Sequence, residues 1–280
     1  MSEPWMLVPP ETTPMLEPEF RPAALANRAF LEAVKAAGGG EPLVLGLERG
    51  DGSISRYETV VFPDKHPKSE ANLFYAERLL KFLLWQRGAC KVYVGGSEEI
   101  ARFLKKCYAP GGLRAFDAEF MGRDVYEKDF EVIHCAPHEV PQTHETTSSL
   151  GRHLNGCRIG FDLGASDRKV SAVVDGNPVY SEEVIWEPAK HSDPAYHYNE
   201  IMAALRSAAS HLPRVDAIGG SSAGVYVNNR PMVASLFRAV PRDRYGEIRD
   251  MFLRIGREMG VPLVVVNDGE VTALAGSMAL

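Results

Sequence analysis

One stretch near the middle of the chain places small, hydroxyl-bearing and charged residues between two strand-like segments. It reads Asp162-Leu-Gly-Ala-Ser-Asp-Arg-Lys169, with strand formers before it at 157–163 and after it at 170–174. The backbone N–H groups of such a turn and the hydroxyl of Ser166 can approach an anion closely, and Asp162 can hold a cation or its water shell. The same residues also fit an ordinary hairpin with a solvated tip, so the stretch alone leaves both interpretations open.

Two further polar turns follow predicted strands in the same part of the chain. Gly219-Gly-Ser-Ser-Ala-Gly224 follows a strand expected at 215–219, and Asn267-Asp-Gly269 follows a strand expected at 262–266. Parallel strands bring their carboxyl ends to one edge of a sheet, where the ligands of α/β proteins bind. The sequence therefore predicts that the three turns converge on one binding site.

The elements that must position these turns follow a regular order after residue 157. The expected order is three strands at 157–163, 169–174 and 178–186, a helix at 198–212, a strand at 215–219, a helix at 244–259, a strand at 262–266 and a helix from Asp268. This βββαβαβ(α) order predicts a mixed sheet that begins as a meander and continues through helical crossovers.

The first 156 residues are expected to be organised differently. Residues 1–22 are rich in proline, which predicts an extended arm, and the polar segment 137–156, broken by prolines, predicts a linker. Residues 23–136 between them predict an α+β region of unknown role. Its expected elements are a helix at 22–37, a hairpin turning at Asp51-Gly52, a helix at 69–88 capped by Ser69, a strand at 90–94, a helix at 97–108 and a strand at 130–134.

Two patterns in this first region resemble functional motifs but have simpler explanations. The helix at 22–37 could open the winged helix of a repressor, but a β-hairpin follows it instead of two more helices. The pair Gly95-Gly96, ahead of a helix that Ser97 can cap, could bind an anion. A tight strand-to-helix turn is the favoured interpretation of that pair.

Composition and charge exclude several classes of function. The 280 residues are 45% hydrophobic and 24% charged, as in globular proteins, and the net charge of −6 does not favour nucleic acid or an anionic membrane as a partner. No apolar run is long enough to span a membrane. The cysteines lie far apart without C-x-x-C spacing, so we expect no structural zinc and a cytoplasmic protein with reduced thiols. They are Cys90, Cys107, Cys135 and Cys157.

The predicted element order and the turn from Asp162 to Lys169 together resemble the first half of the actin-like ATPase (ribonuclease H-like) fold of sugar kinases, Hsp70 and actin. Within it, Asn267-Asp-Gly-Glu-Val-Thr-Ala-Leu-Ala275 looks like the N-D-x-x-x-x-A-L-A run of the ROK (repressor, open reading frame, kinase) family and of bacterial glucokinases. The resemblance covers roughly residues 157–280. It implies an α/β domain that binds ATP, Mg²⁺ and a small-molecule sugar.

The resemblance also implies roles for individual residues. Asp162 would organise Mg²⁺ through water, Asp268 would be the general base for a sugar hydroxyl, and Asn267 would hydrogen-bond neighbouring hydroxyls. The residues that it places beside the ATP phosphates are Gly164, Ala165, Ser166 and Lys169. Those that it places on the sugar side are Gly220, Ser221, Ser222, Gly224, Asn228 and Asn229.

Several of these residues also have plain structural interpretations. Asp268 can cap the last helix, which is compatible with catalysis, and Lys169 can be a solvated strand residue. Asn228 and Asn229 can simply form a turn. The cluster from His191 to His197 invites a metal interpretation, but a structural or substrate-facing role is favoured.

The chain also departs from the family pattern. It has Gly164-Ala-Ser166 where the family often has Gly-Gly-Thr, and Gly276 where an acidic residue is common. The second phosphate turn, the adenosine-binding glycines and the histidine–cysteine zinc cluster of many ROK proteins would all follow Leu280. We therefore expect either a piece of a longer protein, which is favoured, or a fold completed by a partner chain.

Two hypotheses about function remain. The first is a ROK-like sugar kinase, of which this chain holds the phosphate-1 and sugar-side half and would be inactive alone. The second is a non-catalytic sugar-sensing or regulatory protein. The sequence leaves open which sugar is bound and whether the chain forms a homo-oligomer.

Overall fold

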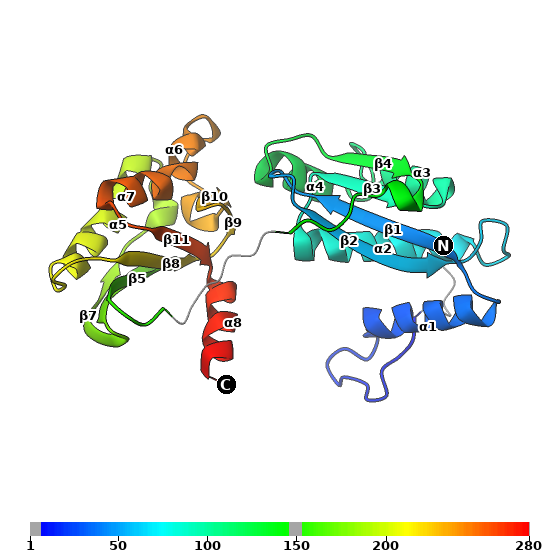
Figure 1. The fold of residues 1–280 in the computed structure, drawn as a ribbon, viewed down its shortest axis with the longest axis horizontal. Helices are drawn as coiled ribbons and strands as arrows, with labels where there is room; N and C mark the ends of the chain where they lie inside the picture. The colour runs from blue at the N-terminus through cyan, green and yellow to red at the C-terminus, as the bar shows by residue number, and fades with distance from the viewer. Residues whose placement is uncertain (1–6, 146–152, 280) are drawn as a thin grey trace. The chain divides into compact units, whose positions relative to one another are not determined.

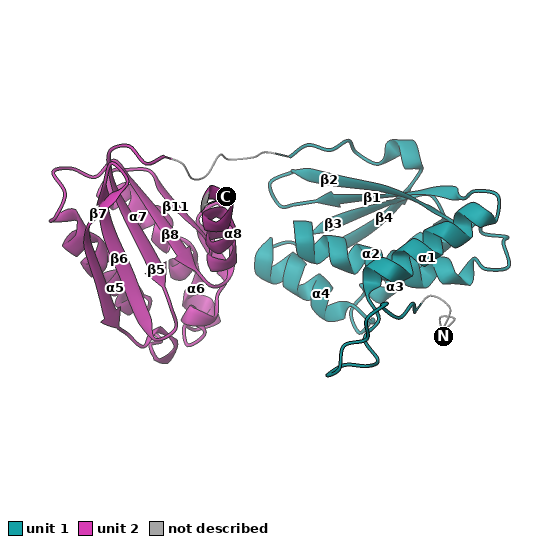
Figure 2. Ribbon diagram, turned by 90° about the horizontal axis from the view of Figure 1, so that it is seen from below, with its two compact units in different colours: residues 1–147 teal, residues 148–280 magenta. Residues whose placement is uncertain are grey.

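The computed structural model describes residues 7–145 and 153–279, which divide into two compact units, 1–147 and 148–280 (Figure 1, Figure 2). Each unit has a hydrophobic core of its own. Both units are mixed α/β structures with mixed sheets, so the predicted fold class is confirmed. Among the described residues, no helix combines the length and the apolar character needed to cross a bilayer.

Unit 1 is built on a four-stranded sheet in the order β2-β1-β3-β4. The predicted hairpin is present as β1 (Glu41–Glu48) and β2 (Ile54–Val61). Strand β3 (Lys91–Gly95) pairs antiparallel with β1, and β4 (Glu131–Cys135) pairs parallel with β3. The core lies between one face of this sheet and the helices, where Leu43, Leu45 and Leu47 of β1 are buried.

The main helices of unit 1 are α1 (Ala23–Ala36), α2 (Glu70–Arg87) and α3 (Glu98–Cys107). A short helix α4 (Ala115–Glu119) runs into a π-helical turn at Phe120–Val125. Ser97 caps α3 as predicted, because its hydroxyl oxygen accepts a hydrogen bond from the N–H of Ile100 at 3.3 Å. The predicted cap Ser69 makes no such bond, since its backbone is already helical (φ −60°, ψ −26°).

Part of the predicted linker belongs to unit 1. Val140 is only 1% exposed, and the backbone of His144 pairs with that of Ile54 through N–H···O contacts of 2.8 and 2.9 Å. The linker prediction is therefore wrong for residues 137–145, where one buried valine among prolines anchors the segment on the sheet. Residues 146–152 of the predicted linker lie outside the described residues.

Unit 2 contains a five-stranded sheet in the order β11-β8-β5-β6-β7. Strands β5 (Cys157–Leu163), β6 (Asp167–Val174) and β7 (Asn177–Ile185) form the predicted antiparallel meander. Strands β8 (Ala217–Ser222) and β11 (Leu263–Asn267) continue the sheet on the other side of β5, and both run parallel to β5. This is the mixed sheet that the element order predicted.

Helices α5 (Pro194–Ala209), α6 (Tyr245–Arg249), α7 (Met251–Met259) and α8 (Asp268–Ala279) belong to unit 2. Side chains of α5 and α7 form one core with the sheet face that carries Phe161. The helix expected at 244–259 is interrupted at Asp250, so it forms α6 and α7. Helix α5 begins four residues earlier than expected because the Asp193 carboxylate caps it, accepting the N–H of Ala195 at 3.1 Å.

One hairpin of unit 2 was not predicted. Strands β9 (Val225–Val227) and β10 (Arg230–Val233) pair antiparallel around Asn228 and Asn229. Both asparagines have positive φ, 52° and 63°. Two central residues of positive φ are what a tight two-residue hairpin turn requires, and asparagine adopts them more readily than most residues.

Candidate functional site

Three parallel strands of unit 2 end in register at one edge of the sheet. Asp162 of β5 is paired with Ser221 of β8, and in the next row Ser222 of β8 is paired with both Leu163 and Asn267. The next residue after β11 is Asp268, the first of α8. The structure thus brings the three predicted turns to a common edge, as parallel strand ends dictate.

The carboxylate of Asp162 is half-buried beside β8. It accepts a hydrogen bond from the hydroxyl of Ser221. Its negative charge also contributes to a raised pKa of Lys169, although the hydrogen bond from Lys169 to Asp167 is the larger cause. A carboxylate with one oxygen engaged in this way keeps its second oxygen for a hard cation or for water in that cation's shell, so Asp162 fits the predicted role with Mg²⁺.

Trp186 fixes the turn between β5 and β6 through two hydrogen bonds. The indole N–H of Trp186 donates to the carbonyl oxygen of Gly164 at 2.9 Å, and its backbone N–H donates to that of Ser166 at 3.1 Å. Trp186 is buried, whereas Ala165 and Ser166 are exposed. Nothing in the sequence marked Trp186 as more than the end of a strand, because this contact joins residues about 20 positions apart.

Two residues predicted to contact phosphate are engaged by a carboxylate that the sequence analysis did not assign. The hydroxyl of Ser166 donates to Asp167 at 2.8 Å, and the ammonium of Lys169 forms an ion pair with the same carboxylate. Glu183 of β7 lies 3.7 Å from that ammonium. The hydrogen bonds from Lys169 and Ser166 lower the pKa of Asp167, so it is charged at neutral pH. Asp167 lies inside the predicted motif, so the sequence could have revealed it.

The expected glycine loop at 219–224 is for the most part a strand. Gly220, Ser221 and Ser222 belong to β8, since parallel pairing with β5 and β11 continues to Ser222, and this part of the loop prediction is wrong. A Cβ atom on Gly220 would lie 2.0 Å from the ring of Phe161, so glycine is required there for packing. Only Gly224, with φ 142°, occupies a turn conformation that favours glycine.

The hydroxyl of Ser222 faces the interior. It donates to the carbonyl oxygen of Leu163 at 3.2 Å, and the residue is fully buried. The hydroxyl of Tyr226 on β9 is also buried, and burial is the main cause that raises its pKa to about 12. The ring of Tyr226 packs near Phe252 of α7, with centroids 6.2 Å apart. Nothing in the sequence marked Tyr226 as part of the site, because the β9–β10 hairpin that carries it has no strong local signal.

Asn267 ends β11 and Asp268 begins α8, and their side chains make different contacts. The amide of Asn267 donates to the carbonyl oxygen of Gly224 at 2.8 Å, and its oxygen accepts the N–H of Gly269 at 2.8 Å. Asp268 is exposed, and one of its oxygens accepts the same N–H at 2.9 Å. Asn267 therefore ties the turn after β8 to α8, while Asp268 combines a capping contact with an oxygen that can accept a proton.

Asn228 and Asn229 form a hairpin turn, which was the structural alternative to a role in sugar binding. The side chain of Asn229 uses both polar atoms on the backbone of β11: it donates to Leu263 and accepts from the N–H of Val265, both at 2.9 Å. Asn228 is exposed at the tip of the turn. Their predicted contact with sugar hydroxyls remains a prediction, and Asn229 has a structural function of its own.

The cluster from His191 to His197 packs as an aromatic group. The ring of His191 stacks on Tyr196 with centroids 3.6 Å apart, while His197 is fully buried with its Nε2 3.2 Å from the carbonyl oxygen of His191. Asp193 pairs with Arg244 at 3.2 Å. Within residues 7–145 and 153–279, no group of three or more His, Cys, Asp or Glu side chains is arranged to hold a metal ion.

Comparisons with known proteins give partial matches to solved structures. No protein-family model matches the chain, and no curated protein matches it. A ROK hexokinase from Thermus thermophilus is 19% identical over 40% of this chain and 34% of its own, with a TM-score of 0.28. A ROK family transcriptional regulator, homologous to the E. coli MLC protein, is 18% identical over 45% of this chain and 31% of its own, with a TM-score of 0.35.

A third solved structure also matches part of the chain. Thermus thermophilus RuvC in complex with a Holliday junction substrate is 15% identical over 42% of this chain and 69% of its own, with a TM-score of 0.27. This chain spans about a third of the length of the ROK structures that it matches. Similarity this low assigns no activity, and the fold class of unit 2 depends on its own strand order and directions.

Proposed function

We propose that unit 2 is the phosphate-1 and sugar-side half of a ROK-like sugar kinase, which transfers a phosphoryl group from ATP to a sugar hydroxyl. The observation that supports this most is the row of strand ends that brings Asp162 and Ser221 to the same edge as Asp268. Phosphoryl transfer needs a cation site, donors for phosphate oxygens and a carboxylate for the attacking hydroxyl. The edge offers a group for each requirement.

The residues of this chain would divide the work as follows. Asp162 would hold Mg²⁺ through water, and the exposed turn at Ala165 and Ser166, kept in place by Trp186, would face the phosphates. Asp268 would accept the proton of the sugar hydroxyl with the oxygen that does not cap α8. When bound, Mg-ATP supplies the phosphoryl group and neutralises charge as it develops.

A second function, a non-catalytic sugar sensor, is favoured by one specific observation. Ser166 and Lys169 are both engaged by Asp167, so the turn carries a negative charge where phosphate would bind. An anion would have to compete with that carboxylate for both groups. A protein that binds sugar without ATP turnover would tolerate this arrangement.

The test uses the full-length protein that contains this chain, assayed with ATP against a panel of hexoses and amino sugars. The Asp268→Asn variant should lose about 10²–10⁴-fold in turnover and still bind the sugar, because removing a general base affects the proton transfer. Asp243→Asn, an exposed carboxylate far from the strand ends in sequence, is the matched control and should keep wild-type turnover.

Two results would contradict the kinase proposal. Wild-type turnover in Asp268→Asn would remove Asp268 from the role of base. Sugar binding without phosphorylation of any member of the panel would favour the sensor. The isolated 280-residue chain is expected to show no kinase activity, and ATP-dependent sugar phosphorylation by it would contradict the assignment of half a nucleotide site.

A further inference from the structure

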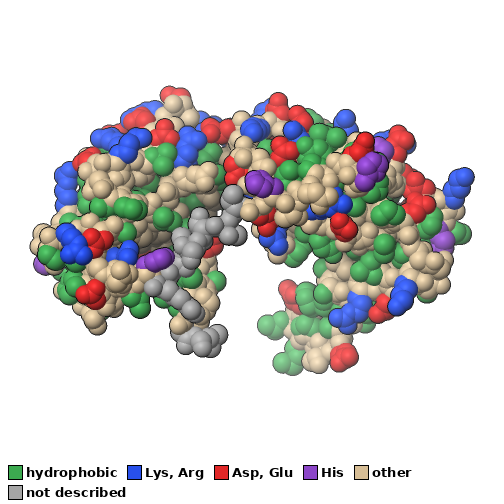
Figure 3. Space-filling view, in the orientation of Figure 1, with side chains coloured by type: hydrophobic (Ala, Val, Ile, Leu, Met, Phe, Trp, Pro, Cys, Tyr) green, Lys and Arg blue, Asp and Glu red, His purple; other side chains and the backbone are tan. Residues whose placement is uncertain are grey.

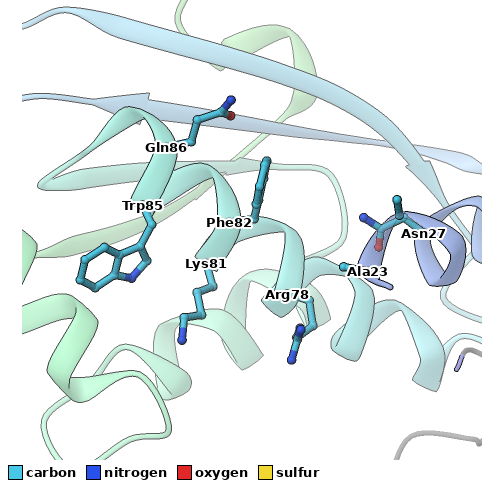
Figure 4. Close-up of a pocket in the computed structure, with 8 residues that line it drawn as sticks. Ala23, Asn27, Arg78, Lys81, Phe82, Trp85 and Gln86 are labelled. Carbon is cyan, nitrogen blue, oxygen red and sulfur yellow. The ribbon is translucent and has the colours of Figure 1, made fainter. Parts of the chain in front are cut away.

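A groove of about 600 Å³ lies between α1 and α2 of unit 1 (Figure 4). Its walls include Ala23 and Asn27 from the first turns of α1. From α2 it receives Arg78, Lys81, Phe82 and Trp85. The four α2 residues follow the spacing i, i+3, i+4 and i+7, so they share one face of the helix. No role in the proposed kinase site uses this groove.

The groove is apolar with a positive charge. Phe82 is 63% exposed and Trp85 is 46% exposed, although both are large hydrophobic side chains. The indole N–H of Trp85 donates to the buried carboxylate of Asp117 at 2.6 Å, so its ring is fixed in position. Arg78 and Lys81 place two positive charges on the wall of the groove, and the guanidinium of Arg78 lies 5.9 Å from the ring centroid of Phe74. An apolar segment that carries carboxylates would complement this surface.

The arm that precedes α1 has that complementary chemistry. Met15 and Leu16 are each 96% exposed, and Phe20 is 46% exposed. Residues 7–22 include three glutamates, Glu11, Glu17 and Glu19, and one arginine, Arg21, which pairs with Glu19 at 3.4 Å, so the segment is acidic overall. Figure 3 shows hydrophobic side chains gathered on the surface of this segment. The arm and the groove are thus two exposed apolar surfaces of opposite charge on the same chain.

We propose that the arm of one copy docks in the α1–α2 groove of a second copy, and that the reciprocal exchange forms a two-fold symmetric dimer. Leu16 and Phe20 would pack on Phe82 and Trp85. The neighbouring glutamates would face the two basic residues of α2. A proline-rich arm loses little conformational freedom on docking, which favours it as a binding segment.

The local structure of the arm favours a second copy over the arm's own groove. Backbone hydrogen bonds from Glu17 to Pro14 and from Phe20 to Glu17 close successive turns. Arg21 then donates to the carbonyl oxygens of Pro18 and Phe20 at 3.2 and 2.9 Å. The groove starts at Ala23, so an intramolecular arm would have to undo these turns and reverse direction within a few residues. The arm of another copy needs no reversal.

The test measures the oligomeric state of the chain by sedimentation equilibrium. The wild type is expected to be a dimer, and Leu16→Glu and Phe82→Glu should each raise the dimer dissociation constant by at least about tenfold. Leu113→Glu is the matched control, because Leu113 is 70% exposed on unit 1 but does not line the groove. Circular dichroism checks that every variant is folded.

Charge reversal tests which surfaces meet. Lys81→Glu together with Arg78→Glu should weaken the dimer, and adding Glu17→Lys with Glu19→Lys to the same chain should restore it. A synthetic peptide of residues 7–22 should bind the Leu16→Glu variant and change the fluorescence of Trp85, while a scrambled peptide should not.

Three results would overturn the proposal. The first is a wild type that stays monomeric at about 100 µM, a concentration at which a specific contact of this kind should form. The second is a dimer that tolerates both Leu16→Glu and Phe82→Glu. The third is a peptide of residues 7–22 that leaves the fluorescence of Trp85 unchanged.

Discussion

The two units differ in whether the sheet face opposite the main core is covered by other residues. In unit 1, Gly46 and Gly95 lie on the face opposite the main core, and Val140 covers both: a Cβ atom on either would meet its methyl groups within 2.8 Å. In unit 2, Gly160 and Gly219 are paired on the corresponding face, and a Cβ atom on either would meet nothing within 4 Å. The same residue type therefore marks a closed surface in one unit and an open one in the other.

The strand ends differ in the same way. Gly95-Gly96 of unit 1 precedes α3, but Val140 covers Gly95, and the hydroxyl of Ser97 at the start of α3 donates to Asp64 at 2.6 Å. A carboxylate beside a helix N-terminus disfavours a bound anion, so this glycine pair is the tight turn that was favoured from the sequence. The edge of unit 2 leaves Ala165 and Asp268 exposed. Similar local patterns thus differ in what covers them.

The largest expected difference in stability comes from placing a carboxylate on the covered face of unit 1 and, for comparison, on the exposed turn of unit 2. Val140→Asp would bury an unpaired carboxylate between Gly46 and Gly95, and it should destabilise unit 1 by more than about 3 kcal/mol. Ala165→Asp, at the open turn of unit 2, should change stability by less than about 0.5 kcal/mol. Hydrogen exchange measured by mass spectrometry reports on each unit separately. Equal protection in wild type and Val140→Asp would show that Val140 does not close the sheet.

A second comparison uses neighbouring glycines of β8 that face opposite sides of the sheet. Gly220→Ala would force the buried ring of Phe161 to move and should cost about 1–3 kcal/mol. Gly219→Ala faces open space and should be neutral or stabilising by up to about 1 kcal/mol, because it restricts the unfolded chain. Chemical denaturation of the two variants measures both effects. A Gly220→Ala variant as stable as Gly219→Ala would contradict the close packing of Phe161.

A third test concerns the charge at the open turn, and it depends on the proposed nucleotide site. Asp167→Asn would release Ser166 and Lys169 and remove a negative charge beside the phosphates. The Kd for Mg-ATP should fall by about two- to fivefold, which isothermal titration calorimetry of the full-length protein can measure. Glu183→Gln is the control. The Glu183 carboxylate lies farther from Lys169 than that of Asp167, so its removal should have the smaller effect. Weaker binding by Asp167→Asn would show that Asp167 orders the turn and does not obstruct it.

The smallest expected effect is a pH dependence confined to unit 2. Burial lowers the pKa of His197, so the unfolded chain binds a proton more readily than the folded one. Stability should be greatest above about pH 6.5, the ordinary pKa of histidine, and should fall as the pH drops toward the lowered pKa of His197. Thermal unfolding at pH 5 and pH 7.5 checks this.

Two variants assign that pH dependence to His197. His197→Phe keeps an aromatic ring against Trp186 and Phe237 and should flatten the pH profile. His211→Gln changes an exposed histidine on the same unit and should leave the profile as in the wild type. If His197→Phe lost as much stability at low pH as the wild type, a group other than His197 would be the cause.

Much of the fold was readable from local signals. The hairpin at Asp51-Gly52, the helix end at Gly260 and the meander after residue 157 each depend on contacts within a few residues, and each is present. Errors occurred where distant residues decide. Ser222 was expected in a loop because its neighbours are glycine and serine, yet pairing with strands about 50 residues away keeps it in β8.

The candidate site shows the same division. The residue types at Asp162 and Asp268 and their positions at the ends of apolar strands were sufficient to expect them at the same edge of the sheet, because the ends of parallel strands share an edge. The sequence could not reveal that Trp186 donates a hydrogen bond to the turn between β5 and β6. It also did not show that Asn229 is committed to β11.

By itself, then, the sequence determined the order of the main helices and strands apart from the β9–β10 hairpin, the mixed sheet of unit 2 and the edge where its polar turns gather. These follow from periodicity, turn residues and the handedness of crossovers, which act over short stretches of chain. Only the tertiary structure decided which glycine turn is covered by Val140, which hydroxyl Asp162 engages, and which side chains are buried in the core. Such contacts join residues that are far apart in the chain, and no local pattern specifies them.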